Sequence, residues 1–557
     1  MPDDADSAPP FPPDRVAQYR RAGLWTGEPL GDVLRRAARA HAERPALVTV
    51  ETRLTHAELD ALTDDFAAGL LAATPLRPGD RVVFQSGNEA ETVIAYYGCV
   101  KAGVVPVATL PQHGEREIAH LAAHTGARGH LVQADFRNRD LVALGARLGI
   151  GTLIVARAAA PDGAIGFADV LAAGRDPRAR TALAAVEIDP LGLVALQLSG
   201  GTTGLPKVAP RRHEEYVYNS RVWAEALELT AESVVLHPLP IMHNAGISAA
   251  LQPAHLVGGT CVVAPVGDPG PTLELIAKEQ VTVLPVVPPA VAIRLLEHPQ
   301  ARHADLSSLR RFVIGGQRPS AELIERLERE LGIRALQMFG MAEGMFLYVP
   351  PDAPEWARLH TVGATISPAD EVRVLEVGGD EEVPDGTLGE LSCRGPYTIP
   401  GYYRAAQHNA ATFTADGFYR TGDLVTRHVV DGRAYYAIDG RIKDVINRGA
   451  EKIHAEEVEE LLVRHPDVRS AALVGMPDPV LGERICAYLV LADGAAAPTV
   501  ASMAEFLLGE GLAKFKLPER IEVVPAFPLT DVGKVSKKDL RADIQLKLAK
   551  EKEGIGA

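Results

Sequence analysis

A strand–helix–strand pattern between residues 311 and 340 constrains the fold more than any other feature of the chain. RRFVIGG reads as a short buried strand that runs into Gly315 and Gly316, and IRALQMFG reads as a second strand that also ends in glycine. The segment between them, PSAELIERLERELG, predicts an amphipathic helix capped by Ser320. This order indicates parallel α/β layers, in which ligands bind beyond the carboxyl ends of the strands. The apolar stripe of the predicted helix consists of Leu323, Ile324, Leu327 and Leu331.

The pattern changes further along the chain and predicts more than one domain. Past residue 365, ADEVRVLEV, GELSCRG and RAYYAIDG are short alternating strands, while SAALVGMPD, RICAYLVLA and RIEVVPAF predict the strands of a small α+β unit. We expect an α/β protein with a large N-terminal domain of α/β layers plus a β-rich subdomain, and a small mobile α+β C-terminal domain. The predicted bounds are 1–438 for the N-terminal domain, 439–443 for a hinge and 444–557 for the C-terminal domain.

Composition and charge exclude several classes of partner. The 557 residues carry a formal net charge of -15 without a basic stripe, which argues against nucleic acid. The start, MPDDADSAPPFPPD, lacks the features of a signal peptide, and the most apolar stretch, VTVLPVVPPAVAI, is too short and too interrupted by proline to span a bilayer. The cysteines form no CxxC pair, so we expect a cytoplasmic protein without a zinc site or disulfide framework. They are Cys99, Cys261, Cys393 and Cys486.

The segment LQLSGGTTGLPKVAPRRH predicts a phosphate-binding loop. Its small and hydroxylated residues let backbone N–H groups approach phosphate oxygens, and a lysine follows them. The Walker form GxxxxGK[ST] is absent, because Leu205 and Pro206 precede the lysine and Val208 follows it, so a P-loop phosphotransferase is disfavoured. A flexible surface turn is the alternative. The candidate phosphate ligands are Ser199, Gly200, Gly201, Thr202, Thr203, Gly204 and Lys207.

Three further motifs offer candidate site residues. In FYRTGDLV, Asp423 is suited to accept hydrogen bonds from ribose hydroxyls, with a β-turn role as the alternative. In FGMAEG, Glu343 offers the oxygen ligand that Mg²⁺ prefers, with a helix-capping role as the alternative. In PLTDVGKVSKKDL, Lys534 follows a glycine in a predicted tight turn, with an ordinary surface lysine as the alternative, and we expect Lys537 and Lys538 to be solvated.

Taken together, the motifs resemble those of the adenylate-forming superfamily, which includes acyl-CoA synthetases, firefly-type luciferases and the adenylation domains of nonribosomal peptide synthesis. The matching segments are SGGTTGLPK, LPIMHNAG, GGQ, QMFGMAEG, GELSCRGP, GYY, DGFYRTGDL, GRIKDVINRGAEKI and PLTDVGKVSKKDL. Five segments are similar in particular to stand-alone aryl-acid AMP ligases of the 2,3-dihydroxybenzoate and salicylate type: MFGMAEG, INRGAEKI, AEEVEELLVRHP, PLTDVGKVSKKDL and HNAG.

The resemblance implies two half-reactions, in which an aryl carboxylate attacks ATP to give acyl-AMP and pyrophosphate, and a thiol then takes the acyl group. The implied cofactors are ATP, Mg²⁺ held by Glu343, and coenzyme A or phosphopantetheine as the thiol. Lys534 and His243 are the implied catalytic residues, and Lys443 lies at the implied pivot of the C-terminal domain. The implied ATP-binding residues are Ser199, Gly200, Gly201, Thr202, Thr203, Gly204, Lys207, Gly316, Gln317, Met338, Phe339, Gly340, Met341, Asp423 and Arg441.

The predicted substrate pocket departs from the dihydroxybenzoate pattern. Domains for α-amino acids typically hold the ammonium with an Asp, and Asn244 suits an aryl acid instead, although an Asx turn is the alternative for this residue. Ala245 and Ala249 replace an aromatic residue and a serine, which predicts a larger aryl acid unless Phe346 fills the space. The implied substrate-binding residues are Asn244, Ala245, Ser248, Ala249, Gly315, Gly340 and Phe346.

Several alternatives stay open at this point. An aryl-CoA ligase for a bulkier or bicyclic acid shares the first half-reaction, and the sequence does not separate coenzyme A from an aryl carrier protein acting in trans. A pathway to a siderophore or another secondary metabolite is the expected context. A catalytically silent binding protein is disfavoured, because Lys534, Glu343 and Asp423 are all present.

Overall fold

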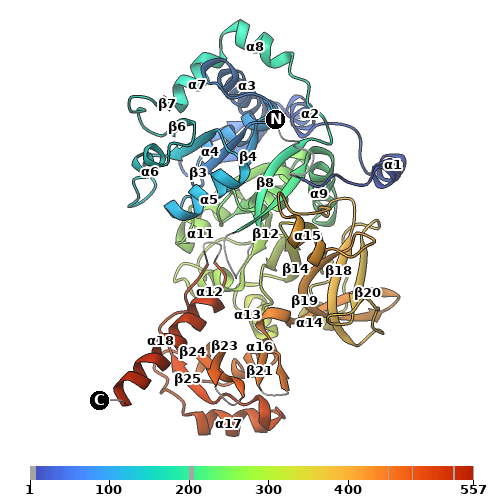
Figure 1. The fold of residues 1–557 in the computed structure, drawn as a ribbon, viewed down its shortest axis with the longest axis vertical. Coiled ribbons are helices and arrows are strands. Elements are labelled where there is room, and N and C mark those ends of the chain that lie inside the picture. Colours follow the sequence, from blue (N-terminus) through green and yellow to red (C-terminus); the bar gives the residue numbers. More distant parts are fainter. Residues whose placement is uncertain (1–7, 200–205, 449–450, 479–480, 531–532, 556–557) are drawn as a thin grey trace. The chain divides into compact units, whose positions relative to one another are not determined.

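The structure, a computed structural model, describes residues 8–199, 206–448, 451–478, 481–530 and 533–555 (Figure 1). The chain forms two compact units. The first unit contains residues 1–359, 363–371 and 393–419, and the second contains residues 360–362, 372–392 and 420–557.

A seven-stranded sheet in the first unit ends at one edge in an antiparallel hairpin. The strand order is β7-β6-β5-β3-β4-β8-β9, and all neighbours are parallel except β8 and β9. Helix α3 packs against α4 and α7 (Figure 1). The strands are β3 (Arg81–Gln85), β4 (Val105–Val107), β5 (Gly129–Gln133), β6 (Thr152–Ala156), β7 (Ile165–Gly166), β8 (Leu193–Ser199) and β9 (Lys207–Arg212). The helices of this region are α1 (Pro13–Arg21), α2 (Leu30–Ala40), α3 (His56–Ala73), α4 (Ala90–Lys101), α5 (Glu115–Thr125), α6 (Leu141–Leu148), α7 (Phe167–Gly174), α8 (Pro177–Ala184) and α9 (His213–Ala226).

A nine-stranded sheet in the same unit has the order β16-β15-β14-β13-β12-β10-β11-β1-β2. The strands from β14 to β1 in this order pair in parallel, whereas β15 and β16 at one edge and β2 at the other pair antiparallel. The strands are β1 (Pro45–Val48), β2 (Arg53–Thr55), β10 (Val234–His237), β11 (Thr260–Val263), β12 (Val283–Val287), β13 (Arg311–Gly315), β14 (Ala335–Met341), β15 (Gly344–Tyr348) and β16 (Ala364–Thr365). The helices around it are α10 (Gln252–Leu256), α11 (Pro269–Glu279), α12 (Pro289–Glu297), α13 (Ala321–Leu331) and α14 (Glu355–His360).

The predicted strand–helix–strand unit is confirmed as β13, α13 and β14. The Ser320 hydroxyl accepts a hydrogen bond of 3.2 Å from the backbone N–H of Leu323, which caps the helix. The predicted apolar stripe of α13 packs into the core between helices and sheet, so helical periodicity was a sufficient signal here. The glycine-containing segments SGGTTG, GGQ and FGMAEG begin in the last residues of strands of two different sheets, since β8 belongs to one sheet and β13 and β14 to the other.

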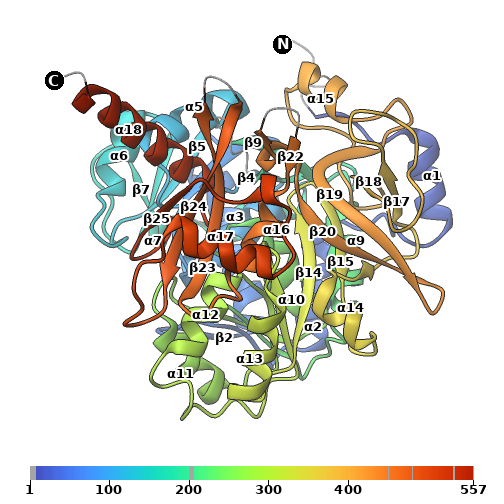
Figure 2. The same ribbon diagram turned by 90° about the horizontal axis from the view of Figure 1, so that it is seen from below.

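The remaining strands form two smaller sheets. The predicted β-rich segments give a four-stranded sheet of β17 (Glu371–Leu375), β18 (Leu388–Arg394), β19 (Tyr419–Val430) and β20 (Arg433–Arg441), and α15 (Ala406–Thr412) precedes β19. Strands β23 and β24 form the centre of a small α+β layer, with α16 and α18 packed on β23 (Figure 2). This layer contains β21 (Ile446–Arg448), β22 (Glu451–Ile453), α16 (Ala455–Leu462), β23 (Val468–Asp478), β24 (Gly482–Leu491), α17 (Val500–Gly509), β25 (Arg520–Val523) and α18 (Lys537–Ile555).

These elements confirm the predicted fold class, a mixed α/β protein with a large N-terminal and a small C-terminal domain. The domain bounds stay a prediction, because the compact units divide the chain near residue 420 and join most of the four-stranded sheet to the C-terminal residues. Among the described residues, no helix has the length and apolar character that crossing a membrane requires.

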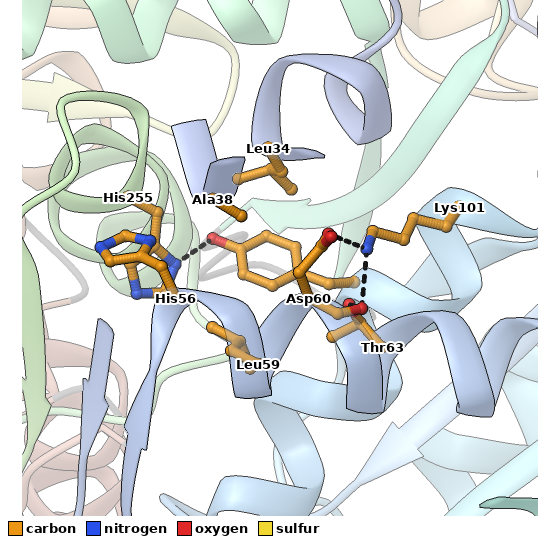
Figure 3. A pocket seen from close by; sticks show the side chains of 9 residues that line it. Leu34, Ala38, His56, Leu59, Asp60, Thr63, Lys101 and His255 are labelled. Atoms are coloured by element: carbon orange, nitrogen blue, oxygen red, sulfur yellow. Dashed lines mark hydrogen bonds and ion pairs between the residues drawn. The ribbon is translucent and has the colours of Figure 1, made fainter. Parts of the chain in front are cut away.

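A buried polar cluster lies between α2, α3, α4 and α10 around a small cavity (Figure 3). Lys101 Nζ contacts the carboxylate of Asp60 and lies 2.9 Å from that of Asp64. Across the cavity, the Tyr97 hydroxyl lies 3.0 Å from Nδ1 of His255. Because the buried ammonium is paired with two carboxylates, we interpret this cluster as part of the helix packing.

Lys537 shows that one sequence expectation was wrong, because its side chain is only 15% exposed. Its ammonium lies 2.8 Å from a carboxylate oxygen of Glu459 and 3.7 Å from one of Glu456, both on α16. Burial lowers the pKa of Lys537, but the charges of these carboxylates outweigh it and raise the pKa overall. The ion pairs therefore hold the start of α18 against α16.

We predict that Lys537→Met destabilises the C-terminal part of the chain. The substitution leaves two half-buried carboxylates without their cation, and the expected loss is about 2–3 kcal/mol. Urea denaturation followed by circular dichroism measures it. Lys538→Met is the matched control, because this neighbouring lysine is exposed. Equal shifts of the denaturation midpoint in both variants would contradict the structural role of Lys537.

Candidate active site

The hairpin of β8 and β9 brings the two ends of the predicted phosphate loop together. Ser199, the last residue of β8, pairs across the hairpin with Lys207, the first residue of β9. The side chain of Ser199 is buried and that of Lys207 is half-buried. The predicted ligands between them lie outside the described residues; these are Gly200, Gly201, Thr202, Thr203 and Gly204.

Glu343, the predicted Mg²⁺ ligand, lies in the turn between β14 and β15. Its side chain is buried, and the hydroxyl of Tyr402 donates a hydrogen bond to its Oε1 atom. Gly344 completes the turn with a φ of 124°, and a Cβ atom there would lie 1.9 Å from the carbonyl oxygen of Tyr397, so only glycine fits. Burial, and then the charge of Glu343, raise the pKa of Tyr402, which keeps this phenol protonated as a donor.

Lys207 shares Tyr402 as a neighbour with Glu343. Its Nζ atom lies 5.4 Å from the centre of the Tyr402 ring and 2.7 Å from Nε2 of His408. Burial lowers the pKa of Lys207, and the charge of Glu343 opposes the shift. The structure thus brings the predicted phosphate-binding lysine and the predicted metal ligand to one tyrosine. Sequence reasoning missed Tyr402, although it lies in the GYY motif, and missed His408, which no motif indicated.

The carboxylate of Glu343 fits a magnesium ion that is shared with a nucleotide. Within the described part of the chain, no group of three or more histidine, cysteine or acidic side chains forms a metal cage. Mg²⁺ typically takes one or two carboxylates and completes its coordination with phosphate oxygens and water. A single buried carboxylate that shares a tyrosine with the predicted phosphate-binding lysine matches this donor set.

Arg211 is a fully buried cation near the end of β9. Its guanidinium forms a two-pronged salt bridge with Glu215 at the start of α9, with N–O distances of 2.8 and 2.7 Å. It also donates to the carbonyl oxygens of Ala342, at 3.0 Å, and Tyr397, at 3.3 Å. The guanidinium lies 4.3 Å from the centre of the Tyr216 ring. Arg211 therefore connects the β9–α9 junction to the turn that carries Glu343.

Asn244 enters the same network with a buried side chain. Its Oδ1 accepts a hydrogen bond of 2.9 Å from Tyr216 and lies 3.5 Å from Nη1 of Arg211, while its Nδ2 donates to the carbonyl oxygen of Met341 at 3.3 Å. The amide makes no capping bond to the π-helix that follows, so the contacts are those of a long-range network and not of an Asx turn. Sequence reasoning singled out Asn244 but missed Arg211, Glu215 and Tyr216.

Three predicted substrate residues, Ala245, Ser248 and Ala249, lie on a π-helix that spans Ala245–Leu251. A π-helix is a rare element that is frequent at functional sites. Ser248 is buried and donates a 2.8 Å hydrogen bond to the carbonyl oxygen of Asn244. Ala249 is also buried, and its carbonyl oxygen accepts a 3.0 Å hydrogen bond from the indole of Trp223. Ala245, one turn earlier, is only half-buried.

An aromatic group lies next to Ala249. The ring of Phe346 meets Trp223 edge-on at 5.2 Å, and Tyr348 and Tyr397 are further ring neighbours within the group. Phe346 also covers Gly340, where a Cβ atom would lie 2.8 Å from its ring. Phe346 is thus buried among the rings of Trp223 and Tyr397. Sequence reasoning missed Trp223, a lone tryptophan inside a helix.

The other residues predicted to contact the nucleotide lie around the ends of β13 and β14. A Cβ atom at Gly315 would lie 2.5 Å from the sulfur of Met338, so this thioether covers the backbone of Gly315, a predicted substrate-binding residue. The imidazole Nδ1 of His243 accepts a hydrogen bond of 3.3 Å from the backbone of Ala245. The residues that remain partly accessible here are Gly316, Gln317, Phe339, Gly340 and Met341.

The second unit carries the rest of the predicted site. Asp423 is buried and pairs with Arg441 across β19 and β20, with Arg441 Nε 2.6 Å from Asp423 Oδ1. Lys443 lies exposed in a short 3-10 turn. Lys534 follows a tight turn in which Thr530 accepts from the Gly533 N–H at 2.8 Å, as the sequence predicted.

Fold and site together are those of a nucleotide-dependent enzyme, with a lysine-bearing hairpin and a single buried carboxylate that are predicted to serve a phosphate–magnesium group. Comparison with known families agrees: the AMP-binding enzyme model matches residues 34–403, and the AMP-binding enzyme C-terminal domain model matches residues 457–534. The chain belongs to the AMP-binding enzyme family. The P-loop phosphotransferase alternative is therefore wrong.

Individual relatives are similar to this chain over nearly its whole length. Pyochelin synthase PchD of Pseudomonas aeruginosa is 42% identical, and the match covers 98% of each chain. The 2,3-dihydroxybenzoate-AMP ligase of Bacillus subtilis is 39% identical over 97% of this chain and 98% of its own. The apo structure of Mycobacterium smegmatis MbtA shares 36% identity with a TM-score of 0.72, covering 96% of this chain and 98% of that one. The predicted resemblance to adenylate-forming enzymes, close to the aryl-acid AMP ligases, is confirmed.

Proposed function

We propose that this chain activates an aryl carboxylic acid with ATP, releasing pyrophosphate, and passes the acyl group from acyl-AMP to a thiol. The observation that carries the aryl specificity is the setting of Asn244. Its described side-chain contacts are the Tyr216 hydroxyl, the Met341 carbonyl and the Arg211 guanidinium, whose charge Glu215 balances. An ammonium group would find no unpaired carboxylate in these contacts, whereas a ring hydroxyl or amine would find an amide.

In the first half-reaction, the carboxylate of the acid attacks the α-phosphorus of ATP, and the bond to the pyrophosphate oxygen breaks. Two anions must meet, so cations have to offset their repulsion. Lys207 and the flanking loop would bind the β- and γ-phosphates, and Glu343 would hold Mg²⁺, which neutralises phosphate charge when bound. Lys534 would bridge the carboxylate and the α-phosphate as a point cation.

Two residues of the second unit would serve the nucleotide and the change between half-reactions. Asp423 would accept hydrogen bonds from the ribose, and Arg441, 2.6 Å away, orients this carboxylate. Lys443 would be the pivot about which the C-terminal domain turns after adenylation. Such a rotation would withdraw Lys534 and admit the thiol. His243 is half-buried and directly precedes Asn244. Its side chain would change position between the two half-reactions.

The second half-reaction requires a thiol, and coenzyme A and a carrier protein offer the same phosphopantetheine arm. An aryl carrier protein acting in trans is our first proposal, in the context of siderophore or related biosynthesis, and an aryl-CoA ligase is the alternative. An acceptor assay with coenzyme A and with candidate carrier proteins separates them. We propose the cytoplasm as the compartment, because the four cysteines are buried free thiols that suit a reducing environment.

Aryl acids should support ATP–pyrophosphate exchange, and proteinogenic α-amino acids should not. The reason is the neutral amide of Asn244 at the position where an amino-acid activator would place a carboxylate. Exchange of labelled pyrophosphate into ATP over a panel of both acid classes measures this. Robust exchange with alanine would refute the aryl assignment, and no exchange with any acid would favour a catalytically silent protein.

Lys534→Ala should lower the rate of adenylation by at least ~10²-fold, as expected for the loss of one group that stabilises transition-state charge. Thiol transfer from preformed acyl-AMP should be largely retained, because this lysine serves only the first step. Single-turnover assays of each half-reaction measure the two rates. Lys538→Ala, a change of an exposed lysine four positions along, is the matched control. Equal losses in both half-reactions would show that Lys534 has a different role.

Ala245→Tyr should restrict the size of the acid. Ala249 is fully buried and Ala245 is only half-buried, so Ala245 is the more accessible of the two alanines. A tyrosine ring of ~150–250 Å² placed there would compete with a bulky or bicyclic acid. We expect the KM for a bulky or bicyclic acid to rise about tenfold or more, and the KM for salicylate to stay unchanged. If salicylate is the best substrate of the unmodified enzyme and larger acids are rejected, the pocket is not enlarged.

A further inference from the structure

His408 makes a close contact with the lysine of the phosphate loop. Its Nε2 atom lies 2.7 Å from Nζ of Lys207, and its ring lies 5.2 Å from the ring of Tyr402. The ammonium of Lys207 is thus held by a ring nitrogen on one side and lies above an aromatic face on another. No motif assigned a role to His408, which lies on the short helix α15, far from Lys207 in the sequence.

The contact determines the state of the imidazole. An ammonium group has only donors, so Nε2 must be the unprotonated nitrogen, and the ring proton lies on Nδ1. The hydroxyl of Thr412 lies 3.3 Å from Nδ1 and 3.1 Å from Nε2, and it donates to the His408 carbonyl at 2.8 Å, so its oxygen is able to accept from the ring. Burial, followed by the charge of Lys207, lowers the pKa of His408, in agreement with a neutral ring.

We propose that His408 is a positioning residue for ATP: its neutral imidazole accepts a hydrogen bond from Lys207 and holds that ammonium beside Tyr402 and Glu343, where it meets the β- and γ-phosphates. The proposal rests on the phosphate-binding role proposed for Lys207. A free lysine side chain loses rotamer entropy when it binds phosphate, and a partner that orders it beforehand reduces this cost. His408 acts through Lys207 and is not proposed to touch the reacting atoms.

The next residue on the helix, Asn409, binds the backbone of Tyr402 and supplies a control. Asn409 accepts a hydrogen bond of 2.8 Å from the Tyr402 N–H and donates one of 2.9 Å to the Tyr402 carbonyl. Asn409→Ala therefore loosens the loop that carries Tyr402 and leaves the imidazole in place. Comparing it with His408→Ala separates loss of the ring nitrogen from loss of loop structure.

The experiment measures binding of two nucleotides to the full chain by calorimetry in the presence of Mg²⁺. One is an ATP analogue with a non-cleavable α–β linkage, and the other is AMP, which lacks the phosphates that Lys207 would contact. His408→Ala should weaken the analogue about tenfold, as for one hydrogen bond to a charged group, and leave AMP unchanged. His408→Gln, which restores an acceptor, should recover most of the affinity. In the Lys207→Ala background, His408→Ala should have no further effect.

Three results would overturn the proposal: an equal loss for AMP and the analogue, additive losses in the Lys207→Ala/His408→Ala double variant, or the same pattern of losses in Asn409→Ala. Failure of the proposed function gives a different result. In that case the unmodified chain would bind the ATP analogue, and the His408 variants would behave as described, but no aryl acid would support pyrophosphate exchange.

Discussion

The buried pair of Arg211 and Glu215 is the interaction on which the rest of the site depends. A guanidinium without solvent exposure has to be paired with a charge and satisfied by further acceptors, or the fold is strongly destabilised. Glu215 supplies the charge from the first turn of α9, and the carbonyls of Ala342 and Tyr397 supply two of the acceptors. These two carbonyls flank the tight turn of Glu343 and Gly344. Satisfying one buried cation therefore fixes the position of the candidate metal ligand.

The same network decides the chemistry that the substrate region offers. Tyr216 stacks on Arg211 and donates to Asn244, so the amide is oriented by a phenol whose own position the cation sets. Beyond Asn244 the chain forms a π-helix, and Trp223 binds its backbone at Ala249. A neutral, oriented amide and an aromatic wall recognise a flat acid with polar substituents better than a zwitterion. The specificity proposed for this enzyme is thus a consequence of how one ion pair is buried.

Prediction from the sequence succeeded where a local pattern carries the information. The stripe of α13, its Ser320 cap and the turn before Lys534 depend on residues a few positions apart, and ordered motifs identified the family. It failed for Lys537, which lies among other lysines near the C-terminus and was therefore expected to be solvated. Helix α16 brings Glu456 and Glu459 against it from 81 and 78 positions earlier. Tyr402 and His408 were missed for a similar reason. Their significance lies in contacts with Glu343 and Lys207 that sequence spacing does not encode.

The sequence by itself determined the α/β class, the family and the candidate residues for phosphate, metal and substrate, because these follow from periodicity and from motifs that keep their chemistry wherever they fold. Only the tertiary structure decided which of these residues meet. It placed Lys207 over the ring of Tyr402 and Glu343 at the hydroxyl of the same residue. It also linked Asn244 to a buried cation and covered Gly340 with Phe346. The physical reason is that burial makes every polar group find a partner, and the available partners come from segments that only the packed sheets bring together.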